Sequence, residues 1–258
     1  MAMFKQPRKA FDPSSHEPFM LSRSKIDLYV ECPRCFYFDR RRGVSRPSIP
    51  AFTLNNAVDK LMKKEFDLLR VNGQVHELVK QYKIDAIPFR HQDLATWRDD
   101  GRTYIGASAL DEKSNLVVSG IIDDMWQDKE GNLVVVDYKA TSTTKTISLE
   151  DRWKQGYKRQ LEIYQWIFRK KGFSVSEIGY FIFANASYNR PKFDGRLEFE
   201  LSIIPHKGNT TWIEPTLSKI KNCLAADNPP AAGPECEYCA YVSGRNHSDA
   251  IQLTVKHT

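Results

Sequence analysis

Apolar residues recur at helical spacing in two long stretches of the chain. In residues 54–70 they fall on one side of a helix with 3.6 residues per turn, so we predict an amphipathic helix that buries this side. The residues of this apolar face are Leu54, Val58, Leu61, Met62, Phe66 and Leu69. Residues 153–171 repeat the pattern and predict a second long helix, whose apolar face is made of Leu161, Tyr164, Ile167 and Phe168.

Shorter apolar runs, rich in β-branched and aromatic residues, predict β-strands. They cover residues 86–90, 102–109, 116–126, 133–140, 177–186 and 196–204. Two further helices are expected near the ends of the chain, at 23–32, ended by Pro33, and at 209–226, kinked or started near Pro215. This order predicts a mixed α/β fold, in which helices flank a mixed sheet and further helices are added at both termini.

The chain has 258 residues, enough for one substantial core. We expect a flexible N-terminal arm over residues 1–20, a single domain over 21–245 and a C-terminal tail over 246–258. No apolar run approaches the roughly 18 residues of a membrane-spanning helix. The start of the chain lacks the apolar stretch of a signal peptide. We therefore expect a cytoplasmic protein whose five cysteines are free or metal-bound rather than paired in disulfides.

The net charge is +6, a balance that suits nucleic-acid binding but occurs in many enzymes. Arginine and lysine gather in residues 39–46, 152–160 and 168–172. Taken alone, each of these stretches is interpreted as a solvated face.

Carboxylates lie at the ends of two neighbouring predicted strands. Asp123 follows one apolar run, and Asp137 and Lys139 close the next. Side chains two residues apart in a strand point to the same face, so Asp137 and Lys139 project together, and Asp123 is expected to converge on them. Carboxylate oxygens, with the carbonyl of Tyr138 as a further ligand, suit Mg²⁺ or Mn²⁺. Such a metal activates water and stabilises charge on a phosphoryl oxygen, while Lys139 orients the water or contacts the phosphate. The alternative is a pair of exposed strand ends with an incidental ion pair.

Three motifs follow one another along the chain: Gly120-Ile-Ile-Asp123, Asp137-Tyr-Lys139 and Gln160-Leu-Glu-Ile-Tyr164. Their order and spacing resemble those of the PD-(D/E)XK nuclease superfamily, most closely its RecB-like branch of AddB-type nuclease domains and CRISPR-associated adaptation exonucleases. The resemblance implies a restriction-endonuclease-like core, with Asp123 and Asp137 as metal ligands and Lys139 as the catalytic lysine. It also implies that Gln160 and Tyr164, one helical turn apart, face the same cleft.

The opening stretch from Leu21, LSRSKIDLYVECP, is similar to the start of that branch, so the resemblance extends from about Leu21 to Cys239. Members of the branch often carry a histidine on the next helix, preceded by a glycine. This chain has Asp59 in place of the histidine and Asn55 in place of the glycine. An aspartate also binds hard cations, so Asp59 is expected as a further metal ligand, the alternative being an exposed surface residue.

Two C-x-x-C pairs lie near the two ends of the predicted domain, Cys32 with Cys35 and Cys236 with Cys239. Four thiolates from two such pairs suit tetrahedral Zn²⁺ or an iron–sulfur cluster. RecB-like members with a 4Fe–4S cluster take one ligand from the N-terminal region and three from the C-terminal region, whereas this chain offers two from each. We expect a 4Fe–4S cluster, with Zn²⁺ or four reduced cysteines as alternatives. Either metal would join the ends of the domain without taking part in hydrolysis, and Cys223 is expected in the core.

Together these patterns predict a Mg²⁺- or Mn²⁺-dependent deoxyribonuclease. We expect an exonuclease that hydrolyses phosphodiester bonds in DNA repair, recombination or CRISPR-type processing. Its expected partners are DNA, single- or double-stranded, and other repair or CRISPR proteins. One alternative is a nucleic-acid-binding relative with a weakened or inactive site, prompted by Asp59. The other is an interaction module held by the cysteine-bound metal, whose strand-end charges are incidental.

Overall fold

The computed structural model describes residues 10–255 apart from 49, 51 and 99–105, with side chains up to residue 247. In chain order its elements are β1 (Phe19–Ser22), α1 (Arg23–Glu31), α2 (Pro33–Arg41), α3 (Thr53–Asn72), α4 (Glu77–Gln81), β2 (Ala86–Pro88), α5 (Leu94–Trp97), β3 (Ala107–Asp111), β4 (Leu116–Gly120), β5 (Asp124–Asp128), β6 (Leu133–Thr141), η1 (Arg152–Lys154), α6 (Gln155–Lys170), β7 (Ile178–Ala186), β8 (Phe199–Lys207), α7 (Ile213–Ala225) and α8 (Glu237–Val255). No helix in this described part of the chain is long and apolar enough to span a membrane.

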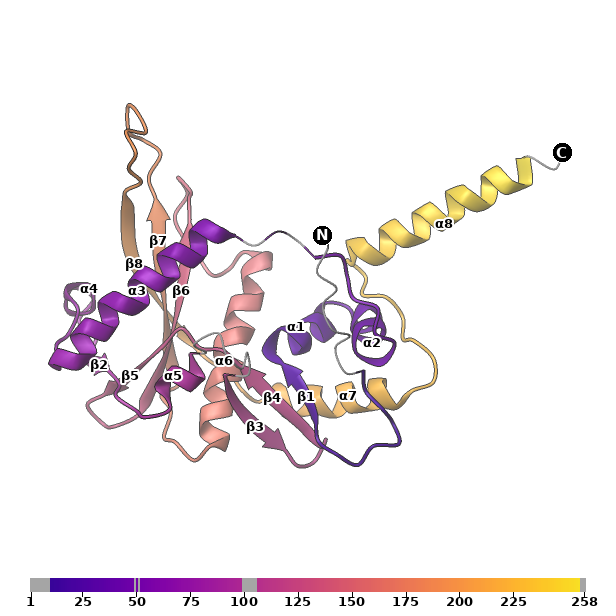
Figure 1. Ribbon diagram of the computed structural model, residues 1–258, viewed down its shortest axis with the longest axis horizontal. Helices are drawn as coiled ribbons and strands as arrows, with labels where there is room; N and C mark the ends of the chain where they lie inside the picture. Colours follow the sequence, from indigo (N-terminus) through magenta and orange to yellow (C-terminus); the bar gives the residue numbers. More distant parts are fainter. Residues whose placement is uncertain (1–9, 49, 51, 99–105, 256–258) are drawn as a thin grey trace, which may run out of the picture.

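Two mixed sheets form the centre of the fold (Figure 1). The larger has the strand order β2-β5-β6-β7-β8, in which β6 and β7 run parallel and the other neighbours antiparallel. The smaller has the order β1-β4-β3, with β1 parallel to β4. Helix α6 packs on one face of the larger sheet, and α3 and α4 pack on the other, so each face has its own apolar core. The mixed α/β class is as predicted.

The strand predicted over residues 116–126 is in fact two strands, β4 and β5, which belong to different sheets. The predicted mixed sheet flanked by helices is thus present, together with a second mixed sheet that the sequence did not indicate. The chain turns away at Gly120, where the ring of Tyr164 fills the space above the backbone: a Cβ at Gly120 would lie 2.4 Å from Tyr164 Cε1. The Tyr164 hydroxyl donates to the carbonyl of Ile121 (2.6 Å), and the Ile122 N–H donates to the carbonyl of Trp97 (3.1 Å). At the break between β4 and β5, the Ile121 carbonyl and the Ile122 N–H are thus hydrogen-bonded to groups outside the sheets.

Helix α3 is present as predicted, but its buried face is narrower than the apolar periodicity indicates. Met62 and Phe66 are buried, whereas Leu54 and Leu61 are 60% and 64% exposed. A helix lying on a sheet buries the row of side chains that faces the strands. The first turns of α3 also extend past the sheet to border a cleft, so Leu54 has no strand to pack against.

The two ends of the domain lie next to each other (Figure 1). Pro33 ends α1 as predicted and also starts a further helix, α2, because proline's missing N–H costs no hydrogen bond at a helix start. The Tyr37 hydroxyl of α2 donates to the carbonyl of Asp227, just after α7 (2.8 Å). Within the segment expected as an arm, Phe11 is buried and donates its N–H to the carbonyl of Arg40 (2.7 Å), while residues 1–9 lie outside the described residues. The segment expected as a tail continues helix α8 to residue 255.

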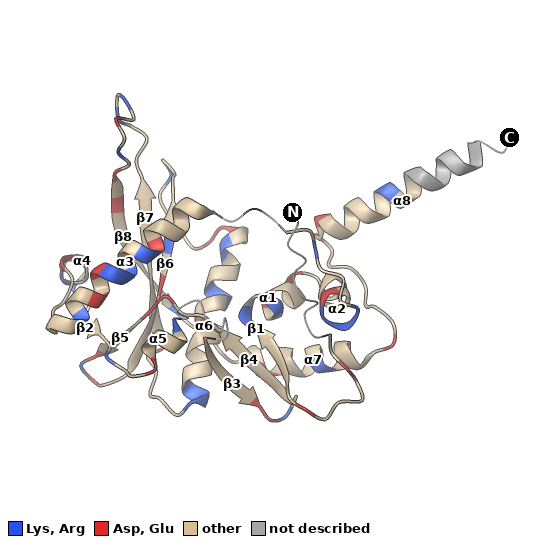
Figure 2. Cartoon of the chain, in the orientation of Figure 1, with Lys and Arg blue, Asp and Glu red and all other residues tan. Residues whose placement is uncertain are grey.

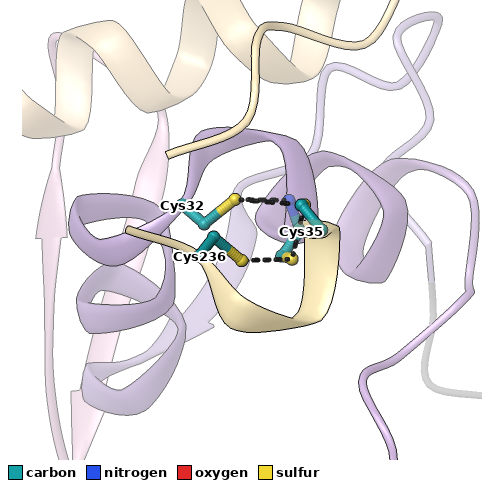
Figure 3. Close-up of side chains that lie close together, drawn as sticks. Cys32, Cys35 and Cys236 are labelled. Atoms are coloured by element: carbon teal, nitrogen blue, oxygen red, sulfur yellow. Dashed lines mark hydrogen bonds between the residues drawn. The ribbon is translucent and has the colours of Figure 1, made fainter. Parts of the chain in front are cut away.

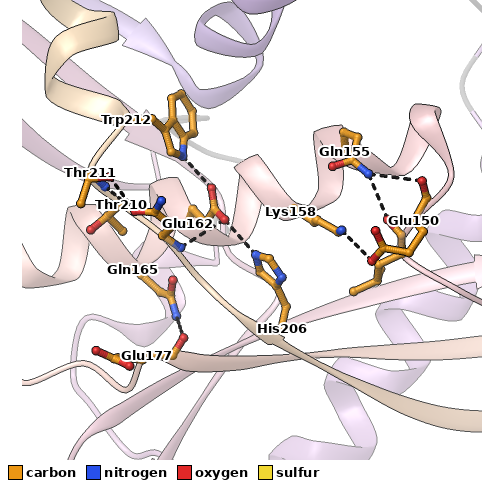
Figure 4. A network of polar contacts seen from close by, with 12 residues as sticks. Glu150, Gln155, Lys158, Glu162, Gln165, Glu177, His206, Thr210, Thr211 and Trp212 are labelled. Atoms are coloured by element: carbon orange, nitrogen blue, oxygen red, sulfur yellow. Dashed lines mark hydrogen bonds and ion pairs between the residues drawn. The ribbon is translucent and has the colours of Figure 1, made fainter.

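Polar contacts fix the orientation of α6 (Figure 4). Glu162 is buried, accepts hydrogen bonds from Trp212 Nε1 (2.6 Å) and the Asn209 N–H (3.2 Å), and lies 2.9 Å from His206 Nε2. A buried carboxylate with this many partners has its hydrogen-bonding capacity filled, and its partners fix its orientation. Because these partners belong to β8 and to the segment that starts α7, they hold the helix against both and thereby set the position of its cleft-facing side chains.

Candidate functional site

Asp137, in the middle of β6, and Lys139, nearer its end, form an ion pair, as expected for side chains two residues apart. The Asp137 side chain is completely buried. Its Oδ1 accepts a hydrogen bond from Gln160 Nε2 (2.7 Å), and the same amide donates to the Tyr164 hydroxyl (3.1 Å). Gln160 and Tyr164 of α6 therefore lie beside Asp137 in the same cleft. The Lys139 ammonium also lies 4.6 Å from the ring centre of Tyr157.

Asp123 lies at the break between β4 and β5 and turns towards the end of β6. Its Oδ2 accepts the backbone N–H of Tyr138 (2.9 Å), and its Oδ1 pairs with Lys63 Nζ of α3 (3.1 Å). Burial acts to raise the pKa of Asp123, but the nearby charges of Lys63 and Lys139 and the Tyr138 N–H outweigh it and hold the pKa below its usual value. Asp123 is therefore ionised and available as an oxygen ligand at neutral pH.

Asp137 has the opposite electrostatic behaviour. Burial raises its pKa to about 7; Lys139 opposes the rise, and the charge of Asp123 adds to it. Two carboxylates that approach one another in a buried site disfavour each other's ionisation unless a cation joins them. The pair is thus poised to bind a divalent ion, with the proton on Asp137 as its competitor at mildly acidic pH.

Asp59 of α3 approaches the same site. Its Oδ2 pairs with Lys63 Nζ (2.9 Å), and its Oδ1 is buried without a hydrogen bond from any described residue. Burial raises the pKa of Asp59, and the charge of Asp123 raises it further, against the effect of Lys63. A buried carboxylate oxygen without a partner, close to the carboxylate of Asp123, is a donor of the kind that suits a hard divalent cation. The residues present therefore fit Mg²⁺ or Mn²⁺.

Asp124, next to Asp123, takes no part in this arrangement. Its side chain points to the other face of the sheet, where it is fully buried and forms an ion pair with Arg70. It also accepts hydrogen bonds from the Tyr138 hydroxyl (2.7 Å) and the Met125 N–H (2.8 Å). Asp124 therefore links α3 to β6 on the face of the sheet opposite Asp123, through Arg70 and Tyr138. It also orients Tyr138, whose backbone N–H donates to Asp123.

A cleft of about 1370 Å³ extends from the carboxylates to the cysteine pairs. Arginines and aromatic residues line its walls, among them Arg23, Arg46, Arg152, Arg159, Phe52, Trp153, Tyr157 and Tyr238. The side chains of Trp153 and Phe52 are 63% and 68% exposed. Basic residues are prominent along α6 and α2 (Figure 2). Exposed aromatic rings beside arginines provide stacking surfaces and phosphate contacts, the combination by which proteins hold nucleic acid.

The four cysteines of the two C-x-x-C pairs meet in one cluster, although about two hundred residues separate the pairs. Their sulfurs all lie within 4.8 Å of one another. The closest sulfur–sulfur distances are 3.5 Å from Cys35 to Cys236, 3.6 Å from Cys35 to Cys239 and 3.7 Å from Cys32 to Cys239. Figure 3 shows the labelled side chains pointing towards one another from the start of α2 and the start of α8.

Hydrogen-bond donors surround the sulfurs. Cys32 Sγ accepts the N–H of Gly233 (3.2 Å) and of Cys35 (3.4 Å), and Cys236 Sγ accepts a hydrogen bond from Arg46 (3.4 Å). Burial acts to raise the pKa of Cys32, but these backbone donors and the neighbouring thiols lower it to about 6. A thiolate stabilised in this way is ready to bind a metal. Cys223 lies apart on α7, where burial raises its pKa to about 11, and it packs against the core as expected.

A family model assigns the chain as a whole, because its match covers both the carboxylates and the four cysteines. The model of the PD-(D/E)XK nuclease superfamily matches residues 20–243. The chain belongs to the PD-(D/E)XK nuclease superfamily. The search of curated proteins gave no match. Among solved structures, this PD-(D/E)XK protein is similar to one titled "Crystal structure of SSO0001", with 17% identity, a TM-score of 0.36 and coverage of 89% of this chain and 86% of that one. A likeness this distant adds nothing about function.

Sequence reasoning missed Lys63, which contacts two of the candidate ligands of the PD-(D/E)XK site. The spacing of Asp59 and Lys63 is that of an i,i+4 ion pair on one helix face, which would have pointed to it. Of the three basic stretches, two reach the cleft through Arg46, Arg152 and Arg159. Arg152 is largely exposed, as a solvated face predicts, whereas Arg46 and Arg159 are mostly buried and form ion pairs with Glu31 and Asp27.

Proposed function

We propose that this PD-(D/E)XK protein is a divalent-metal-dependent deoxyribonuclease that hydrolyses phosphodiester bonds. The observation that supports the proposal best is the convergence of Asp123, Asp137 and Lys139 beside an open cleft. An ion pair that only stabilised the fold would not need a second carboxylate at its side or access to solvent. Arginines and exposed aromatic side chains on the cleft walls match a polynucleotide substrate.

Each residue of the site has a distinct task in this proposal. Asp123 and Asp137, with Asp59 as a third carboxylate, would hold a divalent ion, which would supply the Lewis acidity that activates water and stabilises charge on a phosphoryl oxygen. Lys139 keeps its charge through its pairing with Asp137 and presents its ammonium to the scissile phosphate. Gln160 holds Asp137 Oδ1, which fixes the rotamer of the carboxylate. The Tyr138 N–H does the same for Asp123.

The decisive experiment is a cleavage assay on linear and circular DNA with Mn²⁺ or Mg²⁺. We expect cleavage that EDTA abolishes and that Lys139→Met reduces at least 100-fold. The matched control is Lys129→Met, which removes the same charge from the exposed turn between β5 and β6. Equal activity of the Lys139→Met variant and the control would exclude the assigned site.

We infer that the enzyme is an exonuclease acting in DNA repair, recombination or CRISPR-type processing, as the RecB-like resemblance implies. The same assay tests this point, because an exonuclease degrades linear DNA and leaves a closed circle intact. Degradation of the circle at a similar rate would indicate an endonuclease. Binding of DNA that weakens with salt, but without cleavage, would favour a nucleic-acid-binding relative with an inactive site.

For the cysteine centre we propose one tetrahedral metal ion, Zn²⁺, in place of the 4Fe–4S cluster expected from the sequence. A zinc ion with bonds of about 2.3 Å to four sulfurs requires sulfur–sulfur distances of about 3.8 Å. The closest pairs here are 3.5–3.7 Å apart. A cubic cluster holds its four thiolates on its outside, about 6 Å apart, so its ligands would have to separate to admit it.

Metal analysis of anaerobically purified protein tests this assignment. We expect a colourless protein with about one zinc per chain, reduced in Cys236→Ser but not in Cys223→Ser. Brown protein with iron and acid-labile sulfide would overturn the zinc assignment in favour of the cluster.

A further inference from the structure

Lys63 lies between two carboxylates of the candidate active site. Its Nζ is 2.9 Å from Asp59 Oδ2 and 3.1 Å from Asp123 Oδ1, and 18% of its side chain is exposed. The Lys63 side chain is thus held within ion-pair distance of both carboxylates at once.

This position is the one a cation bridging Asp59 and Asp123 would take. Asp59 and Asp123 come from a helix and from a break between strands, and their charges repel each other. A cation between them offsets that repulsion, and the chain supplies one from the same helix, one turn after Asp59. Asp137 is outside this arrangement, since its own partners are Lys139 and Gln160.

We propose that Lys63 is a built-in counter-cation that occupies the space between Asp59 and Asp123 and competes there with a divalent ion. The inference rests on the proposed metal site and deepens it. While Lys63 remains in place, it occupies Asp59 Oδ2 and Asp123 Oδ1, so that a divalent ion would have to use the other carboxylate oxygens of the site. Full use of Asp59 as a ligand requires the ammonium to move away. Lys63 thereby sets the metal concentration at which the site fills.

Titration calorimetry with Mn²⁺ alone, without DNA, tests this role. Lys63→Met removes the competing charge from the carboxylates and should tighten Mn²⁺ binding at least about tenfold, because a unit charge at this distance is only partly screened. In EDTA the variant should melt at lower temperature than wild type, since the carboxylates then repel without a cation between them. Saturating Mn²⁺ should raise its melting temperature by more than that of wild type.

Lys64→Met is the matched control, because it makes the same change of net charge on an exposed position of the same helix. Its Mn²⁺ affinity should equal that of wild type. Lys63→Gln, which keeps length and polarity, decides the question if the methionine variant does not fold. The inference on Lys63 is wrong if Lys63→Gln binds Mn²⁺ no more tightly than wild type. This result counts against Lys63 alone when wild type binds Mn²⁺ and Asp137→Asn does not. Absence of Mn²⁺ binding in wild type overturns the proposed metal site itself.

Discussion

The carboxylate centre, formed by Asp59, Asp123 and Asp137, and the cysteine centre, formed by the four cysteines of the two C-x-x-C pairs, border the same cleft. They are built in different ways. The carboxylates come from one end of a sheet and one adjacent helix, and charged side chains of the chain itself pair with them. The cysteines come from the two ends of the domain, and backbone N–H groups and one arginine contact their sulfurs. In the first centre Asp59 and Asp123 line the cleft, whereas the second brings four sulfurs within 4.8 Å of one another.

The first arrangement suits a catalytic site, and the second suits a structural metal site. A catalytic metal needs a free coordination position, and a structural zinc site has none. Lys63 and Lys139 pair with the carboxylates and offset their charge, so we expect the fold to tolerate the absence of a metal there. The sulfurs of the cysteine centre have no such internal cation in contact among the described residues apart from Arg46. Metal loss should therefore cost activity at one centre and stability at the other.

The largest effect expected is on catalysis. Asp137→Asn should reduce DNA cleavage by about 1,000-fold or more, because it removes the charge of a metal ligand. In EDTA its melting temperature should equal or exceed that of wild type, since burial already disfavours the ionised carboxylate. Thermal melts beside the cleavage assay check both. A variant that is inactive only because it has unfolded would contradict the comparison.

Loss of a cysteine from the cluster should instead lower the stability of the fold. Cys236→Ser should lower the melting temperature by roughly 10 °C or more, because the ligand that closes a loop of about two hundred residues is lost. Cys223→Ser, at a partly buried position outside the cluster, should change it by less than about 5 °C. Equal melting temperatures for the two variants in calorimetry would show that the four cysteines do not join the ends of the domain.

The pH dependence of metal binding sharpens the contrast. The pKa of Asp137, about 7, is raised above its ordinary value of 3.8, so the metal must displace a proton below pH 7. We expect Mn²⁺ affinity to fall about tenfold per pH unit below 7 and to level off above it. For the metal-free protein, this group contributes stability at low pH that is lost as the pH rises from about 4 to 7. Calorimetric titrations between pH 5.5 and pH 8, with Asp137→Asn as the control, measure the first effect.

The smallest effect concerns the support of the carboxylates. Tyr164→Phe removes the hydroxyl that donates to the Ile121 carbonyl at the break before Asp123. We expect a loss of about 1 kcal/mol, or 2–4 °C in melting temperature. Tyr188→Phe, at an exposed position, should have no measurable effect. A Tyr164→Phe variant as stable as this control would show that the hydrogen bond does not help to hold the break.

Local rules were enough to place the residues that share one element. The two-residue period of a strand puts Asp137 beside Lys139, and the helical period puts Gln160 beside Tyr164. Each of these relations depends only on the backbone geometry of a single strand or helix. The convergence of the cysteine pairs also followed from their spacing, because two C-x-x-C pairs together offer the four thiolates of a single metal site.

Relations between elements could not be predicted in this way. The contact of Lys63 with Asp123 depends on where α3 crosses the sheet, and the break at Gly120 depends on the ring of Tyr164, some forty residues away. An apolar run from 116 to 126 has the composition of one strand whether or not a tyrosine ring divides it. The sulfur spacing that favours a single ion likewise results from the packing of α2 against the start of α8.

The joining of the chain ends also bears on how the protein is made. A ribosome completes the carboxylates, Lys139 and Gln160 well before it reaches Cys236, and at 5–20 residues per second the last cysteine follows Tyr164 by roughly 4–15 seconds. During that interval the nascent chain carries a nearly complete set of catalytic groups, but lacks the cleft wall that Cys236 and Tyr238 contribute. A metal at this site would therefore reach its full set of four sulfurs only late in synthesis. The enzyme should acquire its finished substrate channel only after synthesis has passed residue 239.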